Sequence, residues 1–465
     1  GHAHANGRLS HGLHAFAHMH AGAFAGKNLI LIMMESVDDW LVTPEYMPNL
    51  YRLEQEGVYF RNYYAPIFLA AATFNSEFTA NTGMIAPEYQ VRNSYYSEHA
   101  LPYSLPNRFR DAGYCARSFH AANPNIYNRG QIHLNFGYES YNDASVLDMD
   151  SYMLDAQMLN GYDRIVSDEP FFSFIITYSG HGPYTEEQDT ISAPHLARAR
   201  AVIDYSTVPY TTEAQKEEYT RAVAQAMETD AFIGGLRERL EADGHAEDTV
   251  LMLFTDHYCK YFSDAEFISA IKGETDRNML SNVPFVIWTE GITPQVYDKY
   301  VSTMDIAPTI VDLFSLDADL RYYIGNDMFG PDGGVRLLSL AYERNLAPIA
   351  KPLTLLGATT GDMGASCEKH FGARSDVKVV MLAPKDRMTR FQAAQLYANA
   401  DANVLNIEVE GTFDDCQSIV TKLLKDDAFR TKTRLGAINT VLWARIATQV
   451  AAYFYAYAQA VDTVG

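Results

Sequence analysis

Four polar residues in this sequence could together hold a divalent metal ion. Glu35 directly follows the apolar run 29–34, and Asp256 and His257 follow a second apolar run that ends at 254. Thr73 ends a third apolar run and begins a stretch that reads as a helix. Two carboxylates, one imidazole and one hydroxyl form a mixed oxygen and nitrogen donor set. Such a set suits Mn²⁺ or Zn²⁺, with Mg²⁺ as a further alternative.

Thr73 has two interpretations: it could cap a helix, or it could act as a nucleophile. A threonine at a helix start often caps the free N–H groups. Beside a divalent ion, however, its hydroxyl pKa would fall, and an alkoxide would become accessible near neutral pH. The free N–H groups and the dipole of a helix start also favour negative charge.

Two basic residues could complete such a site. His181 in "SGHGPY" and Arg129 in "YNRG" could bind a phosphoryl group or protonate a leaving oxygen. The alternatives are a turn histidine, a surface arginine and, for "ESVDD" at 35–39, a solvated loop.

Alternating elements would bring these groups together. Strands are expected within 29–34, 57–66, 115–120, 169–184, 248–258 and 283–291. Helices are expected within 47–57, 105–113, 218–244 and 303–316, with an interruption at the Gly-Gly pair 234–235. Strands that alternate with helices predict an α/β fold with a mainly parallel sheet flanked by helices. In such folds, ligands gather at the carboxyl ends of the strands.

Composition excludes several classes of protein. The 465 residues are 48% hydrophobic, which is enough for a sizeable core and argues for more than one domain. A formal charge of −22 disfavours a nucleic-acid partner, although a bound metal would still permit a phosphate substrate. The four cysteines have no zinc-site spacing. No run approaches the roughly 20 apolar residues of a membrane span, so we expect no transmembrane segment in this chain.

The first 26 residues differ from the rest of the chain. Six histidines occur within the first 20 residues. They could bind metal, but a tag-like, low-complexity leader is the simpler interpretation. We therefore expect residues 1–26 to be a disordered leader outside the fold.

Several stretches between 28 and 330 carry a family resemblance. They read "NLILIMMES", "MPNLYRLEQEGVYFRNYYAP", "TFNSEF", "SFHAANPNIYNR", "HLNFGYESYND", "YSGHGPY", "LFTDHY", "VPFVIW" and "TMDIAPTIVDLF". This region, with a domain expected at 27–334, resembles the catalytic domain of the lipoteichoic acid synthases. These are phosphoglycerol transferases of the alkaline phosphatase and sulfatase superfamily. The resemblance implies a manganese site of Glu35, Thr73, Asp256 and His257, with Thr73 also the nucleophile. It implies substrate contacts from His120, Tyr127, Arg129 and His181.

The resemblance implies transfer of phosphoglycerol from a phosphatidylglycerol-like lipid, through a phosphothreonine, to a glycerol-phosphate or glycolipid acceptor. It places the reaction at the outer face of a bacterial membrane or outside the cell. A phosphodiesterase or phosphoethanolamine transferase on the same scaffold is an alternative, as is an inactive binding module or chimera. Tyr127 stands where Trp is frequent, and Ala122 stands where some members have a carboxylate. The family's membrane helices are missing, and no C/S-x-P-x-R motif of sulfatases proper surrounds Thr73.

The C-terminal part resembles a different family. Residues 351–460, within a lobe expected at 335–465, are similar to an internal part of threonine synthase, a fold-type II pyridoxal phosphate enzyme. The resemblance rests on stretches that include "KPLTLLGATTGDMGASCEKHFG" and "VKVVMLAPKDRMTRFQ". No lysine there has the family's Schiff-base context, so we expect an α/β lobe without pyridoxal phosphate or threonine synthase activity. This resemblance would suggest the cytoplasm, and a threonine synthase-related protein is the remaining alternative.

Overall fold

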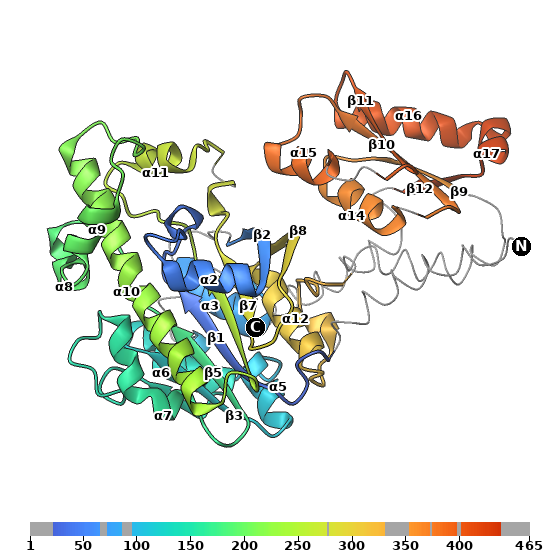
Figure 1. Ribbon diagram of the computed structural model, residues 1–465. Helices are drawn as coiled ribbons and strands as arrows, with labels where there is room; N and C mark the ends of the chain where they lie inside the picture. The colour runs from blue at the N-terminus through green and yellow to red at the C-terminus, as the bar shows by residue number, and fades with distance from the viewer. Residues whose placement is uncertain are drawn as a thin grey trace, which may run out of the picture. The chain divides into compact units, whose positions relative to one another are not determined.

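The computed structural model describes residues 22–65, 72–85, 95–276, 279–330, 353–372, 374–397 and 401–438 (Figure 1). The chain divides into two compact units, Gly1–Phe329 and Gly330–Gly465, and each is described by itself. The expected boundary at 334 and residues 1–21 of the expected leader lie outside the described residues. Among the described helices, none combines the length and apolar character needed to cross a bilayer.

The first unit is built on one large sheet of eight strands, in the order β4-β3-β5-β1-β6-β7-β2-β8. The strands are β1 (Asn28–Met34), β2 (Val58–Tyr64), β3 (Cys115–His120), β4 (Ser140–Asn142), β5 (Phe171–Ile176), β6 (Thr249–Thr255), β7 (Phe285–Trp288) and β8 (Gln295–Ser302). Only β7 pairs antiparallel with its neighbours among these strands. The predicted α/β fold with a mainly parallel sheet is therefore confirmed.

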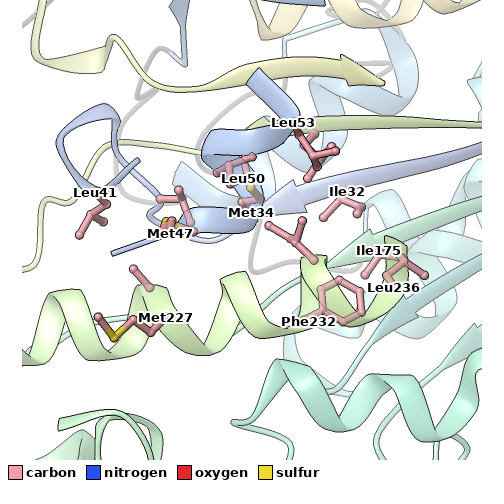
Figure 2. Packing of buried hydrophobic residues seen from close by; sticks show 14 of the residues in the cluster. Ile32, Met34, Leu41, Met47, Leu50, Leu53, Ile175, Met227, Phe232 and Leu236 are labelled. Carbon is pink, nitrogen blue, oxygen red and sulfur yellow. The ribbon is translucent and has the colours of Figure 1, made fainter. Parts of the chain in front are cut away.

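Helices cover both faces of this sheet (Figure 1). They are α2 (Pro48–Glu56), α3 (Ala72–Thr82), α4 (Tyr95–Glu98), α5 (Leu105–Asp111), α6 (Arg129–Phe136), α7 (Tyr162–Ile165), α8 (Asp189–Ser192), α9 (Leu196–Val202), α10 (Glu213–Asp243), α11 (Ala265–Lys272) and α12 (Ile306–Leu313). Because side chains alternate along a strand, β1 contributes to two cores. Ile32 and Met34 pack with helices α2 and α10 (Figure 2), whereas Leu31 and Met33 pack with α3 and α12.

Helix α10 runs without a break from Glu213 to Asp243, so the predicted interruption at the Gly-Gly pair is wrong. Both glycines allow close packing. A Cβ on Gly234 would lie 2.5 Å from the Asn49 side chain, and one on Gly235 would lie 2.5 Å from Leu159. The pair therefore admits neighbouring side chains against the helix.

The first unit begins before residue 27. The backbone N–H of Gly22 donates to Asp312 at 2.9 Å, and that of Phe24 donates to Leu313 at 2.8 Å. The Phe24 ring lies 5.9 Å from the Phe314 ring. The end of the expected leader is thus packed on the end of α12.

The second unit contains a smaller, wholly parallel sheet in the order β11-β10-β9-β12. Its elements are β9 (Leu353–Ala358), α14 (Asp362–Phe371), β10 (Val377–Pro384), α15 (Arg390–Tyr397), β11 (Val404–Val409), α16 (Phe413–Lys425), α17 (Asp427–Thr433) and β12 (Leu435–Ile438). The predicted α/β character of the C-terminal lobe is confirmed for its described residues.

Candidate functional site

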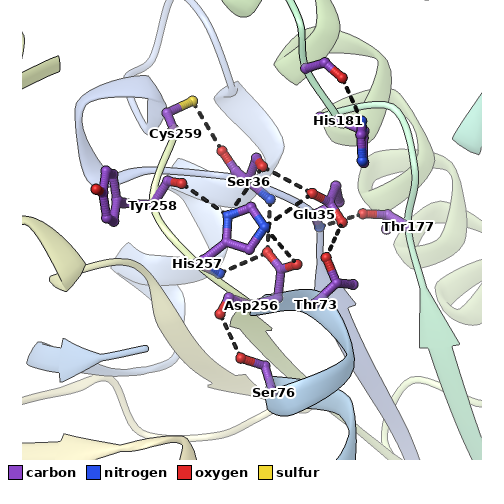
Figure 3. Close-up of polar contacts among 12 residues, drawn as sticks. Glu35, Ser36, Thr73, Ser76, Thr177, His181, Asp256, His257, Tyr258 and Cys259 are labelled. Carbon is purple, nitrogen blue, oxygen red and sulfur yellow. Dashed lines mark hydrogen bonds and ion pairs between the residues drawn. The ribbon is translucent and has the colours of Figure 1, made fainter. Parts of the chain in front are cut away.

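The predicted metal-binding residues meet at the carboxyl edge of the large sheet (Figure 3). Glu35 directly follows β1, and Asp256 and His257 follow the adjacent strand β6. One ligand atom from each of these three residues lies within 4.8 Å of the other two. Residues more than 200 positions apart in the chain therefore come together because β1 and β6 are neighbours.

The buried side chains of this cluster turn potential ligand atoms toward one another. His257 Nδ1 lies 3.0 Å from the carbonyl oxygen of Tyr258, so Nδ1 carries the proton of the neutral ring. The unprotonated Nε2 then lies 3.4 Å from both Glu35 Oε1 and Asp256 Oδ2. Neither His257 Nε2 nor Asp256 Oδ2 has a hydrogen-bond partner among the described residues. Lone pairs that converge in this way fit a shared cation.

Electrostatics supports the same conclusion. The pKa of Glu35 is raised to about 8, first by burial and second by the charge of Asp256. Two buried carboxylates side by side resist ionisation unless a positive charge compensates them. The donor set of two carboxylates and one imidazole fits Mn²⁺, Zn²⁺ or Mg²⁺.

Ser36 orients both carboxylates, and no sequence pattern pointed to it. Its N–H donates to Asp256 Oδ1 at 2.9 Å, and its hydroxyl donates to Glu35 Oε1 at 3.0 Å. The residue has φ 56°, a left-handed conformation that is uncommon outside glycine. Such strain persists where the surrounding contacts require it. Here it turns the chain directly after β1 so that both donors of Ser36 reach the cluster.

Thr73 lies beside the cluster, as the second residue of α3. Its hydroxyl donates to Glu35 Oε2 at 3.2 Å (Figure 3). Further along the helix, the Ser76 hydroxyl donates to the backbone carbonyl of Asp256 at 2.6 Å. These two contacts fix the beginning of α3 against the ends of β1 and β6.

The predicted histidine loop follows β5 and lies against the same cluster. The His181 ring stacks between Tyr178, at 5.4 Å, and Tyr261, at 5.0 Å. Buried Asp155 fixes the loop by accepting the N–H groups of Tyr178 at 2.7 Å and Ser179 at 3.0 Å. His181 is therefore held at a set position beside Glu35 rather than free on a turn.

Gly180 is required by the close approach of this loop to the cluster. A Cβ at Gly180 would lie only 1.9 Å from the Glu35 carbonyl oxygen, so Gly180→Ala must displace Glu35 or the loop. We expect this variant to weaken manganese binding by about tenfold or more, in keeping with lost positioning of a ligand. Calorimetric titration with Mn²⁺ measures the effect.

Gly436→Ala in the second unit is a suitable control for that titration. Its added Cβ would lie 3.3 Å from the flexible end of Leu355. The manganese affinity of Gly436→Ala should equal that of the wild type. Equal affinities of Gly180→Ala and the wild type would contradict the prediction.

His120 and Arg129 lie buried near one another. His120 Nδ1 lies 2.9 Å from the Ile176 carbonyl oxygen, and the pKa of His120 is lowered to about 3, first by burial and then by the charge of Arg129. His120 is thus a neutral ring whose Nε2 accepts hydrogen bonds. Arg129, the first residue of α6, is 4% exposed and carries the local positive charge.

Tyr127 does not join the buried residues. Its side chain is 42% exposed, and its ring centre lies 5.8 Å from the Arg129 guanidinium carbon. The residue has φ 58° and stands just before α6. The predicted site therefore consists of a buried cluster with Tyr127 at the surface beside Arg129.

The family model for sulfatases matches residues 27–316. This chain belongs to the sulfatase family. The matched range includes Glu35, Thr73, Asp256 and His257, which are the four residues at the carboxyl edge of the sheet.

Solved structures show the same fold for this sulfatase-family chain. The lipoteichoic acid synthase LtaP from Listeria monocytogenes is similar with a TM-score of 0.54 and 19% identity, over 67% of this chain and 76% of that chain. A protein of the alkaline phosphatase superfamily from Vibrio parahaemolyticus is similar with a TM-score of 0.51 and 19% identity, over 67% of this chain and 72% of that chain.

Part of the chain is related to threonine synthases. That of Methylobacillus glycogenes is 41% identical over 158 residues, which are 33% of this chain and 32% of that protein. That of Corynebacterium glutamicum is 39% identical over 162 residues, which are 34% of this chain and 32% of that protein. The chain thus spans about a third of the length of these curated relatives.

Two further buried residues of the sulfatase-family unit adjoin the site and were not selected from the sequence. Glu77 lies on α3, four residues after Thr73, and His133 lies on α6, four residues after Arg129. Both side chains are fully buried. The four-residue spacing on each helix was a signal that these pairs share a helix face.

Proposed function

We propose that this sulfatase-family chain transfers a phosphoglycerol group from a phosphatidylglycerol-like lipid through a phosphothreonine at Thr73. The observation that carries the proposal is the Thr73 hydroxyl, hydrogen-bonded to Glu35 at the edge of a cluster that fits a divalent ion. The acceptor would be a hydroxyl of a glycerol phosphate or a glycolipid. The reaction would take place at the outer face of a bacterial membrane.

The first step exchanges one ester bond for another. The Thr73 Oγ–P bond forms while the P–O bond to diacylglycerol breaks. Thr73 loses one proton and the departing diacylglycerol oxygen gains one, so the net charge is unchanged. In the second step the acceptor oxygen bonds to phosphorus while the Thr73 Oγ–P bond breaks. The acceptor hydroxyl loses one proton and Thr73 regains one. A divalent ion, when bound, would lower the hydroxyl pKa of Thr73 and neutralise charge on the phosphoryl oxygens.

The neighbouring residues divide into anion and hydroxyl contacts. Arg129 supplies a permanent positive charge for the phosphodiester. His120 is neutral, and its Nδ1–H donates to the backbone carbonyl of Ile176. Its Nε2 can therefore accept a hydrogen bond from a glycerol hydroxyl. His181, held between two tyrosine rings, would contact the phosphoryl group from the loop after β5.

The deciding experiment is diacylglycerol release from phosphatidylglycerol by the purified chain, with Mn²⁺ and with chelator. We expect release only with the metal. Phosphatidylethanolamine presented in the same way is the matched control, because it differs in the headgroup alone.

Three results would decide between the alternatives. Release from phosphatidylglycerol alone supports phosphatidylglycerol as the donor, for the transferase and for the phosphodiesterase alternative. Release from phosphatidylethanolamine alone would assign the site to phosphoethanolamine instead. A protein that binds Mn²⁺ but releases nothing from either lipid would overturn the proposed donor class.

A further inference from the structure

Glu77 connects the helix of Thr73 to the helix of Arg129. It accepts Arg129 Nε at 2.9 Å through Oε2 and His133 Nε2 at 2.6 Å through Oε1. Glu77 and His133 are fully buried, and the Arg129 side chain is 4% exposed. One carboxylate therefore joins α3 to α6 through both of its oxygens.

The charge states of these three residues are determined by their surroundings. His133 has its pKa lowered by burial and is neutral. Its Nδ1 has no partner among the described residues, so its proton lies on Nε2 and is donated to Glu77. Burial alone would raise the pKa of Glu77, but Arg129 and His133 bring it below the ordinary value. Glu77 is thus an ionised carboxylate with two donors.

The way Glu77 binds Arg129 leaves part of the guanidinium for another ligand. The hydrogen bond to Glu77 uses Nε, and Tyr141 is a further side-chain partner of Arg129. A guanidinium is rigid and planar, so a partner at Nε fixes the direction of the remaining N–H groups. Glu77 and Thr73 are one helical turn apart on α3. The helix therefore sets the distance between the Thr73 hydroxyl and the anchor of Arg129.

We propose that Glu77 is a positioning residue, which directs the terminal nitrogens of Arg129 at the phosphodiester held next to Thr73. This role rests on the proposed function of the site and adds a residue to it. His133 supports Glu77 from the opposite side, since its N–H occupies the second carboxylate oxygen. The helix pair α3 and α6 then presents nucleophile and guanidinium as one rigid unit.

The test measures by calorimetry how tightly inorganic phosphate binds to the manganese-loaded full chain. We expect Glu77→Gln to weaken phosphate binding by about tenfold or more, the effect of one misdirected charge-assisted hydrogen bond. Arg129→Gln should weaken it to a similar extent, and the double variant should be no worse than Arg129→Gln. In the lipid assay, KM should rise more than kcat falls.

Asp230→Asn is the matched control. Asp230 is also a buried carboxylate on a helix, but it accepts the N–H groups of Asn49 and Leu50 at the start of α2. Its replacement should lower stability without changing phosphate affinity. If Glu77→Gln does not fold, Arg129→Lys is the second variant. The lysine keeps a positive charge that can pair with Glu77 but lacks the terminal nitrogens of the guanidinium, so its phosphate affinity should also fall.

The outcomes separate the inference from the proposed function. Unchanged phosphate affinity in folded Glu77→Gln or in Arg129→Lys would overturn the positioning role, as would multiplicative losses in the double variant. A wild-type chain that binds no phosphate would also overturn it. Phosphate binding that depends on Glu77, in a chain that releases no diacylglycerol, would support the inference while the lipid proposal fails.

Discussion

Thr73→Ala is expected to abolish turnover of phosphatidylglycerol while the fold survives. The substitution removes the only atom that can form the phosphothreonine, so the rate should fall by about a thousandfold or more. The structural loss is small, because within the described part of the chain the hydroxyl makes one hydrogen bond, to Glu35, worth about 1 kcal/mol. Diacylglycerol release, with thermal unfolding measured in parallel, checks both parts of the prediction.

The same helix supplies a control for this variant. Thr79 also lies on α3, and its buried hydroxyl has no hydrogen-bond partner among the described residues. Thr79→Ala should keep its turnover. Thr73→Ser should retain measurable activity because it keeps a hydroxyl at the same place. A Thr73→Ala protein with wild-type turnover would refute the assignment of the nucleophile.

The placement of Glu35, Asp256 and His257 could be predicted because it depends on a simple rule. Each follows an apolar strand, and parallel strands end at a common edge. Which strands are neighbours was not readable from the sequence. The pairing of β1 with β6 and with β5 decides which polar residues touch. The rule therefore predicts that these residues lie at the carboxyl edge of the sheet. The order of the strands determines which of them are in contact.

Ser36 and Glu77 were absent from the sequence prediction for different physical reasons. The role of Ser36 depends on a left-handed backbone, and local sequence does not disclose that conformation in a serine. Glu77 belongs to a helix of mixed polarity, where an acid ordinarily faces solvent. It is buried here because α6 brings Arg129 and His133 to it. Tertiary contacts alone bury this carboxylate and supply its two donors.

The wrong interruption in α10 has a related cause. Glycine lowers helix propensity by about 1 kcal/mol relative to alanine, which argued for a break at 234–235. In the structure, the side chains of Asn49 and Leu159 occupy the space that a Cβ would take. Packing against the helix therefore outweighs local propensity.

Asp256→Asn is expected to have opposite effects on the metal-free and metal-bound protein. Without metal, it removes a buried carboxylate whose charge no cation compensates, and that charge is among the causes that raise the pKa of Glu35 to about 8. The asparagine oxygen can still accept the N–H groups of Ser36 and His257 that reach Oδ1. The metal-free variant should therefore melt at a higher temperature than the metal-free wild type.

With metal, the order should reverse. A ligand present at roughly a thousand times its Kd stabilises the folded state by about 4 kcal/mol. Wild-type protein should gain most of this in excess Mn²⁺, whereas Asp256→Asn has lost a charged ligand atom and should gain little. Thermal unfolding with chelator and with Mn²⁺, on both proteins, measures the two effects.

Asp230→Asn serves as the control, since it should lower stability under both conditions and leave the manganese response intact. An Asp256→Asn protein that responds to Mn²⁺ as the wild type does would show that the convergent lone pairs of this cluster hold no cation. The like-charge repulsion would then be balanced by protonation of Glu35 alone.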